Sequence, residues 1–155
     1  MIPNPEYIRQ IIDIVNNKSH YGSLISIKMT DMSVGSARVE VDIESKHIQQ
    51  SGVVDGGLIA ALIDTVTFWA MFLSVRDPHA GLISVDLKLN YLAAATGGKL
   101  VATGREIKMG RTLGYADAEV RDQDGKLIAH GASTCIVLPD QPIVSETPLA
   151  PKFLD

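Results

Sequence analysis

The sequence predicts an α+β domain in which an antiparallel sheet of about six strands wraps around one long central helix, with a short helix before it. Three observations support this fold class. The longest apolar run, residues 52–75, contains one charged residue between Asp55 and Arg76 and has the length of a buried helix. The segments on both sides alternate apolar and polar residues, as half-buried strands do. Turn sequences rich in glycine and aspartate separate these segments.

Size and composition are those of one globular domain. The chain has 155 residues, 46% hydrophobic and 21% charged, and a net charge of -4, which argues against nucleic acid as the main partner. We expect a single domain over 1–138 and a C-terminal tail over 139–155, extended or loosely ordered and containing four prolines. The lone Cys135 and the absence of a basic, apolar leader at Met1 indicate a cytoplasmic protein with a structural thiol.

The N-terminal part predicts one helix and a hairpin. Isoleucines and a valine at helical spacing over 5–15 predict an amphipathic helix, with Asn4 as its cap and Pro5 at its first position. Residues 16–22 have the composition of a loop. Alternation then predicts a hairpin of two strands, 23–32 and 36–43.

The part that follows the central run is predicted to be all β. Pro78 and Gly81 end the helix, because proline lacks a backbone donor and disfavours helix before itself. The turn signals that follow include the Asp-Gly pair at 124–125, a strong hairpin signal. Four strands are expected, at 82–92, 99–109, 113–121 and 126–138.

The central helix carries the question of function in its single carboxylate, Asp64. Both faces of this helix are apolar, which fits the core of a domain or a bilayer. An aspartate at a bilayer centre costs about 2.5–3.5 kcal/mol, and strands surround the helix, so no membrane is expected. Inside a protein the carboxylate needs partners. It is either a core group satisfied by hydrogen bonds or a functional one.

One helix covers one face of a sheet, and neither face of this helix is built for water. More surface must therefore be covered, and a second copy of the chain is the economical partner. We expect a homo-oligomer, either a dimer or a tetramer.

Most sequence motifs that indicate a metal site, a phosphate-binding loop or a catalytic site are absent. The four histidines are far apart and no zinc-type spacing occurs, so no metal and no cofactor are expected. Residues 104–112 resemble a phosphate loop only loosely, and strands rather than a helix follow them.

The start of the central helix is the remaining candidate site. There Gly56 and Gly57 leave free N–H groups at the positive end of the helix dipole. Such groups can stabilise an oxyanion, and Asp64 follows two turns later. The alternative is that small residues only allow close packing.

These residues also carry a family resemblance. The segment from Gln49 through Gly52 and Asp55 to Gly57, with Asp64 nine residues after Asp55, resembles the helix start of the hotdog-fold acyl-CoA thioesterases, in particular the phenylacetate-degradation type, over 21–138. The resemblance implies a hotdog fold and active sites between subunits. It implies that Asp64 is the catalytic carboxylate, either general base or nucleophile, and that the Gly57 N–H holds the thioester carbonyl. It also implies that Ser84 helps to place the water from the neighbouring subunit.

The sequence departs from the family pattern at two positions. Gln49 stands where the family has asparagine, and Asp55 stands where it has histidine. Asp55 is a good helix cap, typically stabilising by about 1 kcal/mol, but its charge opposes a developing oxyanion. His47 could replace the missing histidine, or it could be a loop residue without that role.

The same resemblance places the coenzyme and the acyl group. It puts the nucleotide near basic residues at the strand ends, which here are Lys88, Lys99, Arg105, Lys108 and Arg111. Arg111 is the first choice and Lys108 the second, and the alternative is a solvated strand edge guarded by charge. The acyl group is expected along the helix and under the subunit interface, near Phe68 and Met71. Gly56, at the helix start, is a further candidate for binding the substrate.

These residues bear on three functions. The first is an acyl-CoA thioesterase, which hydrolyses an acyl or aryl-acyl CoA thioester through Asp64. The second is a non-catalytic acyl-CoA binding module, motivated by Asp55. The third, a hydratase or dehydratase, needs a histidine paired with a carboxylate, and the sequence offers no evident pair.

Overall fold

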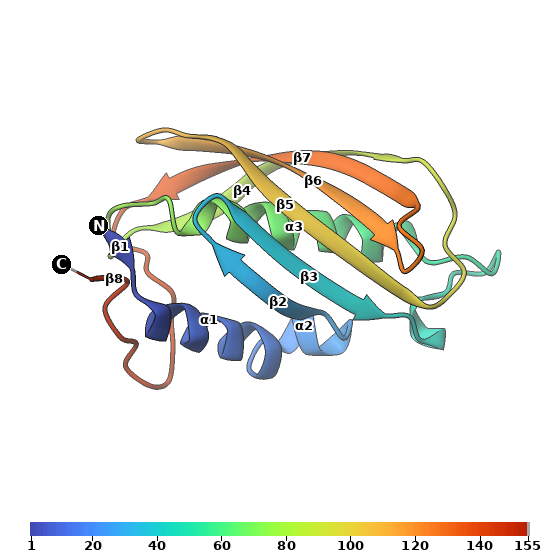
Figure 1. Cartoon of the computed structure of the whole chain (residues 1–155), viewed down its shortest axis with the longest axis horizontal. Helices are drawn as coiled ribbons and strands as arrows, with labels where there is room; N and C mark the ends of the chain where they lie inside the picture. The colour runs from blue at the N-terminus through green and yellow to red at the C-terminus, as the bar shows by residue number, and fades with distance from the viewer. Residues whose placement is uncertain (155) are drawn as a thin grey trace.

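The computed structural model describes residues 1–154 and contains one six-stranded sheet around a central helix (Figure 1). The helices are α1 (Pro5–Asn17), α2 (His20–Leu24) and α3 (Gly56–Phe72), with a 3-10 turn η1 (Ser45–His47). The strands are β1 (Ile2–Pro3), β2 (Lys28–Ser33), β3 (Ser36–Asp42), β4 (Gly81–Tyr91), β5 (Lys99–Met109), β6 (Leu113–Asp122), β7 (Leu127–Leu138) and β8 (Phe153–Leu154).

The large sheet has the strand order β2-β3-β5-β6-β7-β4, and all of its neighbouring strands are antiparallel. In Figure 1 its strands cross obliquely over α3, and α1 lies below β2. The predicted fold class is confirmed: a six-stranded antiparallel sheet, a central helix and a short N-terminal helix. Strand β4 returns to the far edge after the helix, so one backbone edge of β4 has no neighbouring strand among the described residues.

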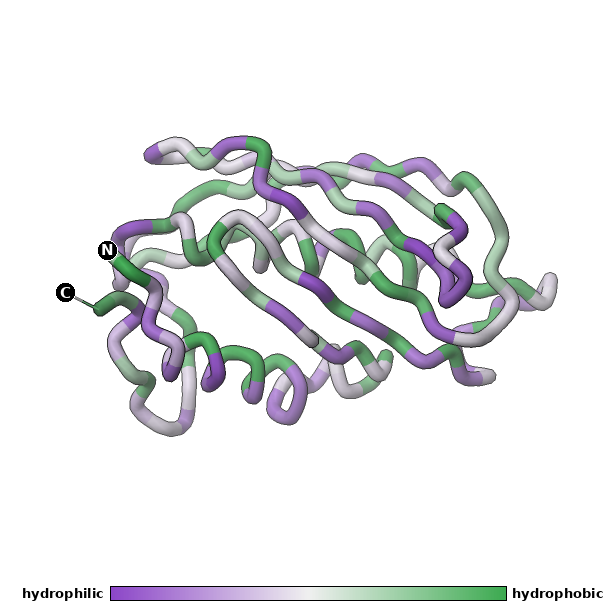
Figure 2. The backbone as a smooth tube through the Cα atoms, viewed as in Figure 1, coloured by the Kyte–Doolittle hydropathy of each residue, from purple (hydrophilic) through white to green (hydrophobic). Residues whose placement is uncertain are grey.

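Helix α3 is held against the sheet by a fully buried apolar face. Leu62, Ile63 and Val66 have no exposed surface, and the hydrophobic residues of α3 lie beneath the strands (Figure 2). At Gly104 of β5 an added Cβ would collide with the backbone oxygen of Val66. The missing side chain at Gly104 therefore lets helix and sheet approach at their centre.

Three differences from the predicted boundaries lie near the candidate site. Residues expected to form a loop contain α2, whose N-cap Ser19 accepts a hydrogen bond from the Gly22 N–H at 3.1 Å. Strand β2, the first strand of the predicted hairpin, consequently begins at Lys28 rather than at residue 23. Helix α3 ends at Phe72, before the expected end at residue 75. These are local effects, because one capping side chain can turn a polar stretch into a short helix.

The C-terminal tail folds back to the start of the chain. Strand β8 pairs with β1, and the Asn4 N–H donates to the Lys152 backbone oxygen at 3.0 Å. The Lys152 side chain is buried, with 3% of the residue exposed, and its Nζ donates to the Val75 backbone oxygen at 2.9 Å. The tail thus covers the region where α3 ends and α1 begins.

The central helix is also short for a bilayer. It has 17 residues, about 25 Å at 1.5 Å per residue, whereas a spanning helix needs about 20 apolar residues. None of the helices within residues 1–154 has the length and apolarity that crossing a membrane requires.

Candidate active site

Asp64 lies on the side of α3 that the sheet leaves open, and it is half-buried. Its Oδ1 accepts a hydrogen bond from the Ser84 hydroxyl at 2.8 Å. Ser84 comes from β4, where it lies opposite Cys135 of β7 on the face turned to the helix. No partner is found for Asp64 Oδ2 within residues 1–154. The carboxylate is therefore positioned by one hydrogen bond and keeps one oxygen open for chemistry.

Asp64 and Ser84 line a pocket of about 330 Å³, within the size range of small-molecule sites. Thr65, Phe68 and Trp69 of α3 form the neighbouring wall. The Phe68 and Trp69 rings meet edge to face with centroids 5.0 Å apart, which makes this wall aromatic and apolar. A carboxylate at the side of such a pocket can act on a group attached to an apolar substrate.

Cys135 lies behind Ser84, with its sulfur 3.7 Å from the Ser84 hydroxyl. The residue is fully buried, and burial raises the pKa of its thiol. A raised pKa keeps the sulfur protonated and poorly nucleophilic. Its place in the core agrees with the structural thiol expected from the sequence.

The start of α3 is capped by Asp55. The Asp55 carboxylate accepts a hydrogen bond from the Gly57 N–H at 2.7 Å, as the sequence predicted for a cap. The donor that was expected to hold the thioester carbonyl is thus engaged within the chain. The Gly56 N–H has no acceptor within residues 1–154, and it points along the same end of the helix.

Tyr91 closes over the other side of this helix start. Its hydroxyl donates to the Gly56 backbone oxygen at 2.9 Å, and an added Cβ on Gly56 would lie 3.0 Å from the Tyr91 ring. Gly56 is therefore needed for a close contact between α3 and β4. The sequence signalled the glycine but not its partner.

Gln49 and His47 lie in the segment that leads into α3, and their side chains serve that segment. The Gln49 amide oxygen accepts from the Ser51 N–H. His47 is buried, its Nδ1 accepts from the Glu44 N–H at 2.9 Å, and its Nε2 lies 2.9 Å from the Ile25 backbone oxygen. Both ring nitrogens have partners when Nε2 carries the proton, so His47 is a structural residue rather than a loop histidine at the surface.

The two halves of the expected site are far apart in one chain. Seven residues separate Gly57 from Asp64, which is about 10 Å along a helix. Reacting groups need separations of about 3–3.5 Å. One carbonyl therefore cannot contact both the start of α3 and Asp64 of the same molecule.

The two residues expected along the acyl group have different environments. Phe68 lines the pocket beside Asp64. Met71 is fully buried, and a Cβ added to Gly114 of β6 would lie 2.7 Å from its sulfur. Met71 lies on the Asp64 side by helical spacing, but the end of the sheet curls over this last turn and takes the side chain into the core.

The basic residues fall into two groups. Lys99 pairs with Glu40 at 2.8 Å, and Arg105 pairs with Asp117 at 3.2 Å. Lys88 donates to Asn90 at 2.9 Å. These three side chains have partners within the chain. Lys108 and Arg111 are exposed, and no side-chain partner is found for them within residues 1–154.

Arg111 lies with a second arginine that the sequence analysis did not single out. Arg76, Asp77, Gly110 and Arg111 line a hollow of about 470 Å³ between the end of α3 and the β5–β6 turn. Two guanidinium groups in one hollow can bind phosphate through several donors. Nothing in the sequence marks Arg76 as a binding residue, because it is simply the first charged residue after the predicted helix.

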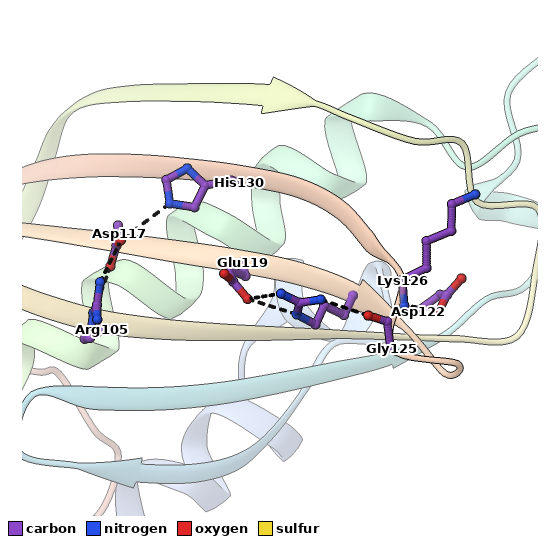
Figure 3. A network of polar contacts seen from close by, with 8 residues as sticks. Arg105, Asp117, Glu119, Asp122, Gly125, Lys126 and His130 are labelled. Carbon is purple, nitrogen blue, oxygen red and sulfur yellow. Dashed lines mark hydrogen bonds and ion pairs between the residues drawn. The ribbon is translucent and has the colours of Figure 1, made fainter.

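The structure brings together one histidine–carboxylate pair that the sequence did not indicate. His130 of β7 lies 3.4 Å from Asp117 of β6, and Arg105 of β5 contacts the same carboxylate (Figure 3). The three side chains lie across the outer face of the sheet, whereas Asp64 and its pocket lie on the helix side. They are an ion-pair network of the sheet surface and do not belong to the candidate site. No cluster of potential metal ligands is found in the described part of the chain.

Comparison with known proteins identifies the class. The family model described as the thioesterase superfamily matches residues 51–129, which include the start of α3, Asp64 and Ser84. The chain belongs to this superfamily, and its α+β fold is the hotdog fold of that family.

Individual proteins that are similar to this chain have more specific names than the superfamily. Acyl-coenzyme A thioesterase 13 of Mus musculus is 34% identical over 97 residues, with 61% of this chain and 68% of the relative covered. The Homo sapiens protein of the same name is 28% identical over 130 residues, covering 82% and 91%. A thioesterase structure from Haemophilus influenzae superposes with a TM-score of 0.77 at 20% identity, covering 85% of this chain and 90% of that one.

Proposed function

We propose that this protein is an acyl-CoA thioesterase in which Asp64 carries the reaction. The observation that supports it most is the Asp64–Ser84 hydrogen bond at the side of an apolar pocket, in a chain of the thioesterase superfamily. Hydrolysis needs a group that activates water or attacks the carbonyl, and a positioned carboxylate can do either. The resemblance to the phenylacetate-degradation type and the aromatic wall favour an aryl-acyl or a compact acyl group.

In the general-base route, an oxygen of Asp64 takes a proton from water while the water oxygen adds to the thioester carbonyl carbon. The tetrahedral oxyanion then collapses and breaks the carbon–sulfur bond, and the CoA sulfur leaves as thiolate and takes up a proton. In the nucleophilic route, Asp64 itself adds, CoA leaves, and water hydrolyses the mixed anhydride. The Ser84 hydroxyl orients the carboxylate in both routes.

The oxyanion is stabilised by N–H groups at the start of α3. Because the Asp55 cap engages the Gly57 N–H, we assign this role first to the Gly56 N–H. Asp64 lies too far from the helix start of its own chain, so the second half of each site comes from another copy. The site is therefore shared in a homodimer, or in a tetramer built from such dimers.

The surface around Asp64 fits such a partner. On the open side of α3, the turn before Asp64 carries the small side chains of Ala60 and Ala61, which lets another helix approach. The adjacent edge strand β4 leaves large apolar side chains exposed, with Val85 and Tyr91 each 56% exposed. Exposed apolar surface on an unpaired edge is typical of an interface.

The nucleotide of the coenzyme is assigned to the hollow with Arg111 and Arg76, and Lys108 adds positive charge on the neighbouring strand β5. Guanidinium groups bind phosphate in bidentate geometry. Charge reversal at Arg111 is expected to raise KM for acyl-CoA while leaving kcat nearly unchanged, because the phosphates do not change charge during the reaction.

The test is CoA release from a panel of aryl-acyl and fatty acyl-CoAs. Asp64→Asn keeps the size of the side chain but removes the base, and kcat is expected to fall by about 10² or more. Ser84→Ala is expected to lower kcat about tenfold, since it loses only an orienting hydrogen bond. Asp31→Asn, an exposed carboxylate on β2, is the matched control. Equal rates for wild type and Asp64→Asn would refute the proposal.

A second experiment tests the shared site. Asp64→Asn and Gly56→Ala each disable one half, the latter because its new Cβ meets Tyr91. Mixed dimers of the two variants contain one site with both halves intact. Unfolding and refolding an equal mixture is expected to restore about a quarter of wild-type activity, because half of the random dimers are mixed. Failure to restore any activity would contradict sharing.

A non-catalytic acyl-CoA binding module is the second candidate, and the Asp55 carboxylate beside the helix start favours it. A negative charge there opposes an oxyanion but does not prevent binding. This function predicts a rise in melting temperature with acyl-CoA and no CoA release. Turnover that depends on Asp64 would exclude it.

A further inference from the structure

The pocket beside Asp64 has a second wall that lies outside the sheet and the central helix. Val15 of α1, Tyr21 of α2 and Ile27 before β2 line it from one direction, and Ile143 of the C-terminal tail lines it as well. Val15 and Ile27 are buried, Ile143 is half-buried, and Tyr21 is largely exposed at the rim. The pocket is thus bounded by the tail and by both N-terminal helices.

We propose that this outer wall, and Ile143 in particular, limits the length of the acyl group that Asp64 can reach. The inference rests on the proposed thioesterase function and adds the side chains that limit the length and the charge of the acyl group. The substrates are CoA thioesters of compact, uncharged acyl groups.

The lining decides the charge of the acyl group. Among the described residues, Asp64 is the only charged side chain in the pocket, and the outer wall is apolar apart from Ser19 and the hydroxyl of Tyr21. Burying an unpaired second carboxylate in such a place costs several kcal/mol. Acyl groups that end in a carboxylate are therefore excluded, while aliphatic and aromatic ends are accepted.

The volume of the pocket limits the size of the acyl group that it can hold. The pocket has about 330 Å³, the share of about eleven waters at roughly 30 Å³ each. An acyl group of about eleven non-hydrogen atoms, at a similar volume per atom, fills that space. A longer straight chain that extends toward α1 and the tail would meet the side chains of the outer wall.

Ile143 can act as a stop because the chain holds it on both sides. Before it, an added Cβ on Gly81 of β4 would collide with the Gln141 backbone oxygen, so the tail lies directly against β4. After it, the Ala150 N–H donates to the Gln10 side chain at 2.8 Å, and the buried Lys152 docks at the end of α3. A wall fixed at two points resists displacement by a ligand.

The test is the dependence of kcat/KM on acyl length for straight-chain acyl-CoAs. Ile143→Ala is expected to move the optimum to longer chains, with a gain of about fourfold for each further methylene that the pocket takes up. Ile143→Phe is expected to move it to shorter chains. Val144→Ala is the matched control, since Val144 is 93% exposed on the same segment. A general loosening of the tail would not shift the two Ile143 variants in opposite directions.

Binding separates this inference from the proposed function. Dissociation constants for the same acyl-CoAs are measured on Asp64→Asn with and without Ile143→Ala. They show how the wall affects the binding of each acyl length in the absence of turnover. A shift of the length optimum in these constants supports the wall even if no CoA is released by any variant. An unchanged optimum in both kcat/KM and the dissociation constants would overturn the inference, while turnover that still requires Asp64 would leave the proposed function standing.

Discussion

The buried ammonium of Lys152 makes the stability of the folded tail depend on pH. Its Nζ donates to the Val75 backbone oxygen and lies 4.1 Å from the centroid of the Phe72 ring. Burial lowers the pKa of Lys152 from 10.5 to about 8, and the charge of Asp77 offsets this only in part. Tyr7 and His79 line the same hollow, and burial raises the pKa of Tyr7 to about 12.

The sign follows from proton binding. Below about pH 8 the lysine is charged in both the folded and the unfolded chain. Between about pH 8 and 10.5 the unfolded chain holds the proton and the folded chain releases it, so the free energy of unfolding rises with pH. The full gain is about 3 kcal/mol at 1.36 kcal/mol per pH unit, and about 2 kcal/mol of it falls between about pH 7 and pH 9.5.

The assay is urea unfolding of wild type and Lys152→Met at several pH values over this range. Methionine keeps the apolar stem and cannot titrate. The free energy of unfolding of the wild type, minus that of the variant, is expected to rise by about 2 kcal/mol. Lys126→Met, at an exposed lysine, is the control and is expected to show no such slope. A flat or falling difference for Lys152→Met would refute the conclusion that the folded chain destabilises this charge.

Two further predictions concern the start and the middle of α3. Asp55→Asn keeps the cap but removes the charge, so it is expected to leave the melting temperature unchanged and raise kcat several-fold, whereas Asp55→Ala loses about 1 kcal/mol of stability. A kcat below wild type for Asp55→Asn would contradict the unfavourable role of its charge. Gly104→Ala places a Cβ against the Val66 backbone oxygen and is expected to cost about 1–3 kcal/mol in urea unfolding. Gly97→Ala, with nothing within 4 Å of its added Cβ, is the control, and equal midpoints for the two variants would contradict the close contact.

Periodicity and turn chemistry determined the architecture without the structure. The alternating segments after Pro78 became four paired strands, and the apolar run after Asp55 became the central helix. The cap at Asp55 was also readable, because capping depends on residues two positions apart. Such features are local, so the order of residues along the chain contains them.

Contacts between distant segments were decided only by tertiary structure. Ser84 meets Asp64 because the turn after α3 and the bulge in β4 between Ser84 and Asp86 set the register of that strand. Ile143 reaches the same pocket because the tail turns back along Gly81. Neither position has a periodic pattern that points to the pocket.

Helical spacing alone also could not predict whether the Met71 side chain lies in the pocket or in the core. It shares the side of Asp64, yet the sheet curls over the last turn of α3 and buries it. The sequence by itself determined the elements, their order and the isolated carboxylate of Asp64. The packed fold decided which side chains surround that carboxylate, because packing joins segments whose separation along the chain leaves no local signal.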